Sequence, residues 1–329
     1  MIELSVVIPI YKVEKYIREL LDSIIFQSEF LNRIEFIFVD DGSPDKSIEI
    51  VKQKIHAFDN VRIIEQKNSG LSVARNNGYE IAQGKYVWFV DSDDKLLPHA
   101  FQLLFEVMSD NPKADVFATF LEVYDESGRL GTYHEKWKKI NVNTGKDYLK
   151  MNYPQGAIQR FIFKKDFLQN NNLFFYPGIL HEDDLFGFQM LYLANKVVIL
   201  NQPIYIYRIN RNGSIMQKRT MRTPQSLIFI HKELKKFMDE KVRTDDKPMF
   251  QYRIHNEIKN FFSFCYSLFD NKEYLAYYVS QKNYIRNESM FLLKNPRTFF
   301  YGIRIMFFPI FYLKIEKVLK KLYHYIKER

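Results

Sequence analysis

The chain has 329 residues, of which 47% are hydrophobic and 26% are charged, and it carries a net charge of +9. This composition excludes a disordered protein and provides a large core, in one domain with an appendage or in two domains. The single cysteine, Cys265, cannot form an internal disulfide, which agrees with a reducing compartment. The first residues lack a secretory signal pattern, so we expect the protein in the cytoplasm.

The positive charge lies in the last third of the chain. Residues 1–216 contain 25 Lys and Arg against 28 Asp and Glu, a net charge of −3, whereas residues 217–329 contain 23 against 11, a net charge of +12. This asymmetry indicates an anionic partner for the last third, either a membrane surface or a nucleic acid. No known nucleic-acid-binding motif accompanies the charge, so we expect no nucleic acid.

Strand and helix patterns alternate over the first 120 residues. Short apolar runs that end in turn formers predict strands, and apolar residues at helical spacing predict the helices between them. In chain order, the pattern predicts a strand at 4–11, a helix at 13–27, a strand at 36–39, a helix at 48–55, a strand at 61–66, a helix at 71–82 and a strand at 86–90. Such alternation is typical of an α/β sandwich built on a mostly parallel sheet.

The rest of the chain is less regular. Residues 120–216 mix polar turns with a second acidic cluster, HEDD (His181–Asp184). From Gln217 onward the patterns are helical, with no strong strand. We therefore expect a catalytic domain at 1–216 and a helical, basic region at 217–329.

Three polar clusters follow predicted strands: the Pro9–Tyr11 turn, Asp40–Ser43 and Asp91–Asp94. Ligands bind beyond the carboxyl ends of parallel strands, so these clusters predict the site. The first strand lacks a G-x-G-x-x-G, and the chain has no G-x-x-x-x-G-K-[ST]. These absences disfavour a dinucleotide fold and a P-loop.

The DSDD segment crowds Asp91, Asp93 and Asp94 into one turn directly after a strand. Like charges at such short range repel, and the usual remedies are protonation or a divalent cation. Oxygen ligands favour a hard ion, Mg²⁺ or Mn²⁺. The alternative is an acidic turn that caps the helix starting near Pro98.

The DDGSPD segment places Asp40 and Asp41 at the end of another strand. Either carboxylate could accept hydrogen bonds from a nucleobase imide or a ribose hydroxyl, and the alternative is an ordinary Asx-turn. Arg75, in SGLSVARNNG, could contact a base or a phosphate, or be a solvated helix cation.

Five motifs in this order resemble family 2 glycosyltransferases of the GT-A fold: LSVVIPIYKVEKYI, FIFVDDGSPD, NSGLSVARNNG, GKYVWFVDSDD and HEDDLF. The resemblance covers about residues 3–215 and includes PIYIYRINRNGSI (Pro203–Ile215), which is similar to the segment that closes the catalytic domain in bacterial capsule and lipopolysaccharide enzymes. It implies a nucleotide-diphospho-sugar transferase sandwich.

The resemblance also implies roles for individual residues. The turn from Pro9 to Tyr11 would frame the base, Asp41 would contact the uracil, and Arg75 would lie near the nucleotide. Asp91 and Asp93 would hold the ribose and the metal, with Asp94 as a third candidate. Asp183, after Glu182, would be the general base, and Asp184 leaves a neighbouring alternative. His181 would line the acceptor site or be a structural hydrogen-bonding partner.

The implied activity is inverting transfer of a sugar, with Mn²⁺ or Mg²⁺, from a nucleotide sugar such as a UDP-sugar to a glycan or lipid-linked glycan of the bacterial cell surface. Two alternatives remain: a non-catalytic nucleotide- or sugar-binding scaffold of the same fold, and an aspartyl-phosphate phosphohydrolase.

The basic tail, 297–329, begins with an apolar stretch, Phe299–Leu313, that is too short to span a bilayer and contains Arg304 and Pro309. Lysines follow it. This pattern predicts peripheral contact with the inner face of the plasma membrane, and the alternative is a tail that packs on the catalytic domain.

Overall fold

The computed structural model describes residues 2–58, 60–125, 127–133, 143–150, 156–210, 220–248, 250–251, 254, 257–258, 260–261, 264 and 271–290. The chain divides into two compact units, Met1–Lys218 and Arg219–Arg329. Across the described ranges, no helix combines the length and the apolar character needed to cross a membrane. The predicted membrane-contacting tail, 297–329, lies outside them.

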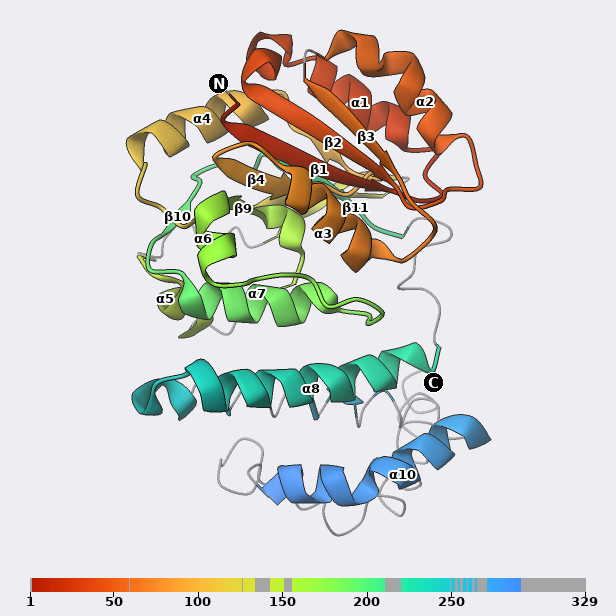
Figure 1. The fold of residues 1–329 in the computed structure, drawn as a ribbon, viewed down its shortest axis with the longest axis vertical. Coiled ribbons are helices and arrows are strands. Elements are labelled where there is room, and N and C mark those ends of the chain that lie inside the picture. Colours follow the sequence, from red (N-terminus) through yellow and green to blue (C-terminus); the bar gives the residue numbers. More distant parts are fainter. Residues whose placement is uncertain are drawn as a thin grey trace, which may run out of the picture. The chain divides into compact units, whose positions relative to one another are not determined.

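A seven-stranded sheet forms the centre of the first unit, in the order β10-β6-β9-β4-β1-β2-β3 (Figure 1). All neighbours pair in parallel except β9, which is antiparallel to both β4 and β6. The α/β class with a mostly parallel sheet is therefore confirmed. The strands are β1 (Leu4–Ile10), β2 (Ile34–Asp40), β3 (Val61–Glu65), β4 (Tyr86–Phe89), β6 (Val116–Ala118), β9 (Phe161–Lys164) and β10 (Val197–Ile199).

Helices connect these strands close to the predicted positions. The first begins at Ile17 rather than Val13, because the preceding residues form a turn in which the Tyr16 amide donates to Val13 O. The helices of this unit are α1 (Ile17–Ile25), α2 (Ser47–Lys54), α3 (Leu71–Ile81), α4 (Ala100–Asp110), α5 (Gly145–Lys150), α6 (Lys165–Asn170) and α7 (Glu182–Leu193), with 3₁₀ turns at Ser28–Arg33, Ile55–Ala57 and Ile158–Arg160.

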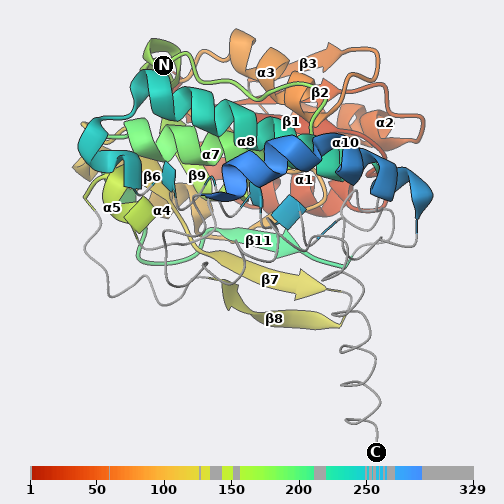
Figure 2. The same ribbon diagram turned by 90° about the horizontal axis from the view of Figure 1, so that it is seen from below.

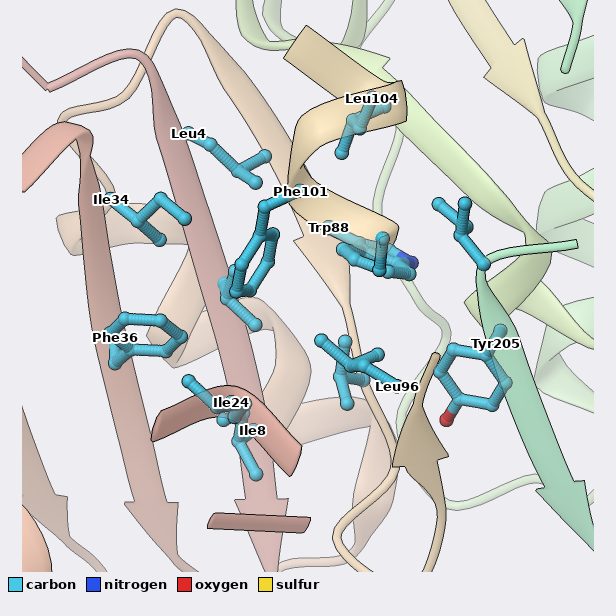
Figure 3. Close-up of a cluster of buried hydrophobic side chains, with 14 of the residues drawn as sticks. Leu4, Ile8, Ile24, Ile34, Phe36, Trp88, Leu96, Phe101, Leu104 and Tyr205 are labelled. Atoms are coloured by element: carbon cyan, nitrogen blue, oxygen red, sulfur yellow. The ribbon is translucent and has the colours of Figure 1, made fainter. Parts of the chain in front are cut away.

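The sheet is covered on both faces. On one face, Leu4 and Ile8 of β1 pack with Trp88 and with Phe101 of α4 in the main hydrophobic core (Figure 3). On the other face, α3 approaches β1 so closely that a Cβ atom on Gly78 would overlap the Val7 side chain. Burial of these large apolar side chains supplies most of the folding free energy.

A second, four-stranded sheet has the order β5-β11-β7-β8. Its strands are β5 (Lys95–Leu96), β7 (Leu121–Asp125), β8 (Gly128–Tyr133) and β11 (Tyr205–Arg208), and Figure 2 shows β11, β7 and β8 side by side. Because β5 directly follows the DSDD segment and pairs antiparallel with β11, this sheet brings Tyr205–Arg208 beside that segment.

The second unit contains α8 (Arg222–Lys241), a 3₁₀ turn at Thr244–Asp246 and α10 (Lys272–Ser289). Its core includes Leu227, Ile258, Phe261 and Ile285. Its described residues include no strand, which confirms the helical character predicted for the C-terminal region.

Candidate active site

The carboxyl ends of β1, β2 and β4 lie at one edge of the main sheet, because β1 pairs in parallel with both neighbours (Figure 1). The turns that follow β1 and β2 are hydrogen-bonded to each other: the Lys12 amide donates to Ser43 Oγ at 2.8 Å. Lys12 has a left-handed backbone, with φ of 56°. The three polar clusters therefore share one edge, as the sequence predicts.

Asp41 is buried and is held by the loop that precedes α3. Its Oδ1 accepts from Gln66 Nε2 at 2.8 Å and from the Ser69 amide at 2.7 Å, and its Oδ2 accepts from the Gly70 amide at 2.9 Å. Asp40 accepts from the Ser43 amide at 2.9 Å, and burial raises its pKa. Both carboxylates thus shape the edge of the site; Asp41 Oδ1 accepts two hydrogen bonds, whereas Asp41 Oδ2 accepts one and retains a lone pair for a further donor.

Two residues of β11, Tyr205 and Arg208, donate hydrogen bonds to the DSDD turn. Asp94 is buried and accepts from Tyr205 Oη at 2.7 Å and from the Arg208 amide at 2.7 Å. Arg208 Nε also donates to the backbone oxygen of Asp93 at 3.0 Å. Burial, with the charges of Asp93 and Asp91, raises the pKa of Asp94 well above its usual range. Asp94 therefore anchors the turn, whereas Asp91 and Asp93 are only partly buried.

Arg75 joins two of the acidic clusters. Its NH2 donates to Asp91 Oδ1 at 2.7 Å and its NH1 donates to Glu182 Oε1 at 2.8 Å. The guanidinium lies 5.2 Å from the ring centroid of Phe175. Only 3% of the Arg75 side chain is exposed, which excludes the alternative of a solvated helix cation. Residues 75, 91 and 182 thus form one network, in which Arg75 and Glu182 are buried and Asp91 is partly exposed.

Glu182 and Asp183, here called the acidic pair, are the first two residues of α7. Asp183 Oδ2 accepts from the Ala157 amide at 2.7 Å, and Oδ1 accepts from the Asp184 amide at 3.0 Å. Burial and the Asp184 charge raise the pKa of Asp183. Burial and the Asp183 charge raise the pKa of Glu182 to about 7. The pKa of Glu182 therefore lies near neutral pH, and that of its neighbour Asp183 is shifted in the same direction, as is common for acid–base groups.

The remaining predicted residues surround this network. Pro9 is a buried part of β1 and pairs with Val39. Tyr11 is 40% exposed, and Lys12 Nζ lies 5.1 Å from its ring centroid. His181 caps α7 with a left-handed backbone, φ of 61°. Neither Pro9 nor Tyr11 contacts the Arg75 network through any of these interactions.

Four further residues support the site and were not predicted: Tyr205, Arg208, Phe175 and Gly156. Gly156 passes so close to the acidic pair that a Cβ atom there would lie 3.1 Å from Asp183 Oδ2. The sequence carries one signal for the first two, because both lie in PIYIYR, within a segment singled out by the resemblance. Nothing in the sequence indicates the roles of Phe175 and Gly156.

The chain is similar in sequence and in fold to known proteins. The model of the family described as "Glycosyl transferase family 2" matches residues 5–170. The chain belongs to glycosyl transferase family 2. It is 34% identical to the uncharacterized glycosyltransferase EpsJ of Bacillus subtilis over 217 residues, which are 64% of this chain and 62% of EpsJ.

A second relative is the poly(ribitol-phosphate) beta-glucosyltransferase of Bacillus spizizenii, which is 30% identical over 217 residues, or 65% of this chain and 33% of that protein. The crystal structure of S. aureus TarS 1-349 in complex with UDP-GlcNAc is 21% identical to this chain and covers 80% of it and 81% of the TarS chain, with a TM-score of 0.62. The match to TarS confirms the GT-A-like fold.

The residues of the DSDD turn fit a divalent cation that is shared with a substrate. Among the described residues, no group of three or more His, Cys, Asp or Glu side chains is arranged as a complete metal site. Mg²⁺ nevertheless needs only one or two protein carboxylates when phosphates and waters supply the other ligands. Asp91 and Asp93 are the candidates, because both side chains are partly exposed, whereas Asp94 is buried against β11.

Proposed function

We propose that this family 2 protein is an inverting glycosyltransferase, that its donor is a UDP-sugar, and that its acceptor is a glycan or lipid-linked glycan of a bacterial cell-surface polysaccharide. The UDP-GlcNAc bound to TarS supports the donor class. The poly(ribitol-phosphate) acted on by the Bacillus spizizenii relative supports a polymer acceptor. The chain matches 62% of the length of EpsJ. The donor and the acceptor are therefore proposed from this chain's own residues as well as from its relatives.

One observation carries the proposal: Arg75 binds both Asp91 of the D-x-D and Glu182 of the acidic pair. A transferase must hold a leaving diphosphate on one side of the sugar and a base on the other. Arg75 thus joins Asp91, proposed to help hold the metal, to Glu182, which directly precedes the proposed base Asp183. A binding scaffold has no need of the acidic pair.

The reaction follows from the positions of the charges. The edge formed by Tyr11, Asp40 and Asp41 would bind the base and ribose of the donor. Asp183 would remove the proton of the acceptor hydroxyl as that oxygen attacks C1. Both Asp183 oxygens accept one backbone hydrogen bond, which fixes the carboxylate and leaves lone pairs for the proton. One in-line displacement inverts the configuration at C1.

A Mn²⁺ or Mg²⁺ ion held by Asp91 and Asp93 would neutralise the charge that develops on the leaving diphosphate. Asp94, Tyr205 and Arg208 would keep these two carboxylates in place. Arg75 would hold Asp91 on one side and Glu182 on the other, and its charge would offset part of the repulsion among the carboxylates.

The tail supports a peripheral position on the inner face of the plasma membrane. Phe and Ile side chains between Phe299 and Leu313 would enter the lipid interface, and the lysines that follow would contact anionic head groups. A chain that ends at Pro296 should remain in the supernatant with anionic liposomes while it still hydrolyses its donor. Equal recovery of the full chain in the supernatant, or a truncated chain that does not fold, would count against membrane contact.

A screen of UDP-sugars, with and without Mn²⁺ and with an excess of chelator, tests the function. We expect metal-dependent release of UDP and, with an acceptor, a product of inverted configuration by NMR. Asp183→Asn should reduce transfer about 10²-fold or more and keep donor binding, whereas Asp166→Asn, at an exposed position at the start of α6, should change neither. Binding without turnover would favour the scaffold, and release of phosphate from simple phosphate esters would favour the phosphohydrolase.

A further inference from the structure

Tyr207 lies on β11, between the two residues of that strand that hold the DSDD turn. Tyr205 Oη and the Arg208 amide each donate to a carboxylate oxygen of Asp94 at 2.7 Å. Alternate residues of a strand point to the same face of the sheet, so Tyr207 lies on the face from which Tyr205 reaches the turn. The Tyr207 ring is partly buried and packs against the main hydrophobic core. The core therefore holds this phenol beside the acidic turn.

The two phenols differ in what their hydroxyl groups contact. Tyr205 Oη is buried, donates to Asp94 and accepts from the Asp91 amide at 3.1 Å. Over the part of the chain that the structure describes, Tyr207 Oη makes no hydrogen bond, and it is not a fully buried atom. A tyrosine whose ring is held and whose hydroxyl is open to solvent can donate that hydrogen bond to a ligand.

Both acidic clusters of the site act on the Tyr207 hydroxyl. Burial raises the pKa of this phenol most, and four carboxylates raise it further, in decreasing order Asp94, Asp91, Asp93 and Asp183. Because the interaction of two charges falls with their separation, this order indicates a hydroxyl near the DSDD turn and within the field of Asp183. The raised pKa keeps the hydroxyl protonated at neutral pH, so it acts there as a neutral hydrogen-bond donor.

We propose that Tyr207 is a further catalytic residue, and that its hydroxyl donates a hydrogen bond to a β-phosphate oxygen of the leaving UDP. Negative charge grows on this phosphate as the bond to the sugar breaks, and a donor already aimed at it stabilises the transition state more than the ground state. A neutral donor suits this position, because a cationic side chain would be repelled by the proposed Mn²⁺ or Mg²⁺. This inference rests on the proposed UDP-sugar transferase activity.

The first test measures binding to the full chain by calorimetry, in the presence of Mn²⁺. The probes are UDP, which carries the charge of the leaving group, and UMP, which lacks the β-phosphate. We expect Tyr207→Phe to weaken UDP binding about tenfold, as for a hydrogen bond to a charged group, and to change UMP binding by less than about twofold. Equal losses for the two nucleotides, or no loss for UDP, would overturn the inference.

The second test compares steady-state kinetics with stability. Tyr207→Phe should lower kcat about tenfold or more with every UDP-sugar that the wild type uses, while the donor KM rises by less than about threefold and the melting temperature stays near that of the wild type. Tyr79→Phe is the matched control, because Tyr79 of α3 is also partly buried and its hydroxyl lies 3.5 Å from Lys165 O. It should leave kcat and the donor KM unchanged.

Three outcomes would contradict the role given to Tyr207. A loss of kcat confined to one UDP-sugar would mean that the hydroxyl contacts the sugar and not the diphosphate. A fall in kcat matched by a fall in melting temperature would mean that the hydroxyl supports the fold. Wild-type protein that does not bind UDP would contradict the inference even if it transfers a sugar from another nucleotide. Conversely, selective loss of UDP binding in Tyr207→Phe, with no transfer by the wild type from any donor, would support the contact and contradict the proposed activity.

Discussion

Tyr205 Oη donates a 2.7 Å hydrogen bond to Asp94 Oδ2, although the two residues are 111 positions apart in the chain. The same oxygen accepts a hydrogen bond from the Asp91 amide at 3.1 Å. One phenol on β11 therefore holds both ends of the DSDD turn. Because the turn carries the carboxylates proposed to bind the metal and the ribose, its geometry depends on a strand of the second sheet.

Tyr205→Phe should weaken both folding and donor binding. The substitution leaves a buried carboxylate oxygen without this donor, so the free energy of unfolding should fall by about 1–3 kcal/mol. The looser turn should raise the donor KM. Urea unfolding and steady-state kinetics measure the two effects.

Tyr86→Phe is the matched control for this prediction. The Tyr86 hydroxyl is buried without a hydrogen bond to any described residue, so its removal should cost little stability. Similar losses in the two variants would mean that the Tyr205 hydroxyl contributes nothing beyond packing.

Arg75→Met should destabilise the first unit and abolish transfer. It leaves Asp91 and Glu182 without their shared cation, at a cost of about 3 kcal/mol, the lower end of the range for a broken buried pair because the Asp91 side chain keeps 24% exposure. Arg75→Met with Glu182→Gln should recover much of the stability and none of the activity. Recovery of both would show that Arg75 has no part in the reaction.

The pH dependence of transfer should respond to Asp184. The Asp184 charge helps to raise the pKa of Asp183, and a base must be deprotonated to act. Asp184→Asn should therefore lower the pKa of Asp183 and move the acid limb of the kcat/KM profile to lower pH. Asp183→Asn should instead reduce transfer about 10²-fold or more at every pH. If Asp184→Asn abolishes transfer and Asp183→Asn does not, Asp184 is the base.

Asp93→Ala should impair donor and metal binding, whereas Asp94→Ala should reduce thermal stability. Asp93→Ala removes a proposed metal ligand, so it should raise the donor KM and the Mn²⁺ concentration required. Asp94→Ala removes the acceptor for Tyr205 and Arg208, so it should lower the melting temperature. Full turnover of the wild type in excess chelator would contradict the metal assignment for both.

The sequence predicts local patterns well and distant contacts poorly. The alternation of buried strands and amphipathic helices over the first 90 residues identifies β1, β2, β3 and β4, and with them the edge where the acidic turns meet. The antiparallel strand β9 could not be predicted, because Phe161–Lys164 is a short apolar run that fits a strand or a buried helix equally.

The partners of the site residues could not be predicted for a related reason. Arg75 and Glu182 are 107 positions apart, and only the folded chain shows that they form an ion pair. The D-x-D pattern identifies three carboxylates and does not distinguish among them. The burial of Asp94 against β11 separates it from Asp91 and Asp93, which are partly exposed.

The close contact of Gly78 with Val7 links the thickness of the sandwich to the reach of a charged group. Gly78 lies one helical turn after Arg75, so the distance between α3 and the sheet sets how far the guanidinium extends toward Asp91. A methyl group added at Gly78 would lift the helix and withdraw the cation. The Gly78→Ala protein would lose turnover although every reacting group is intact, because the packing of α3 on the sheet sets the position of the Arg75 guanidinium.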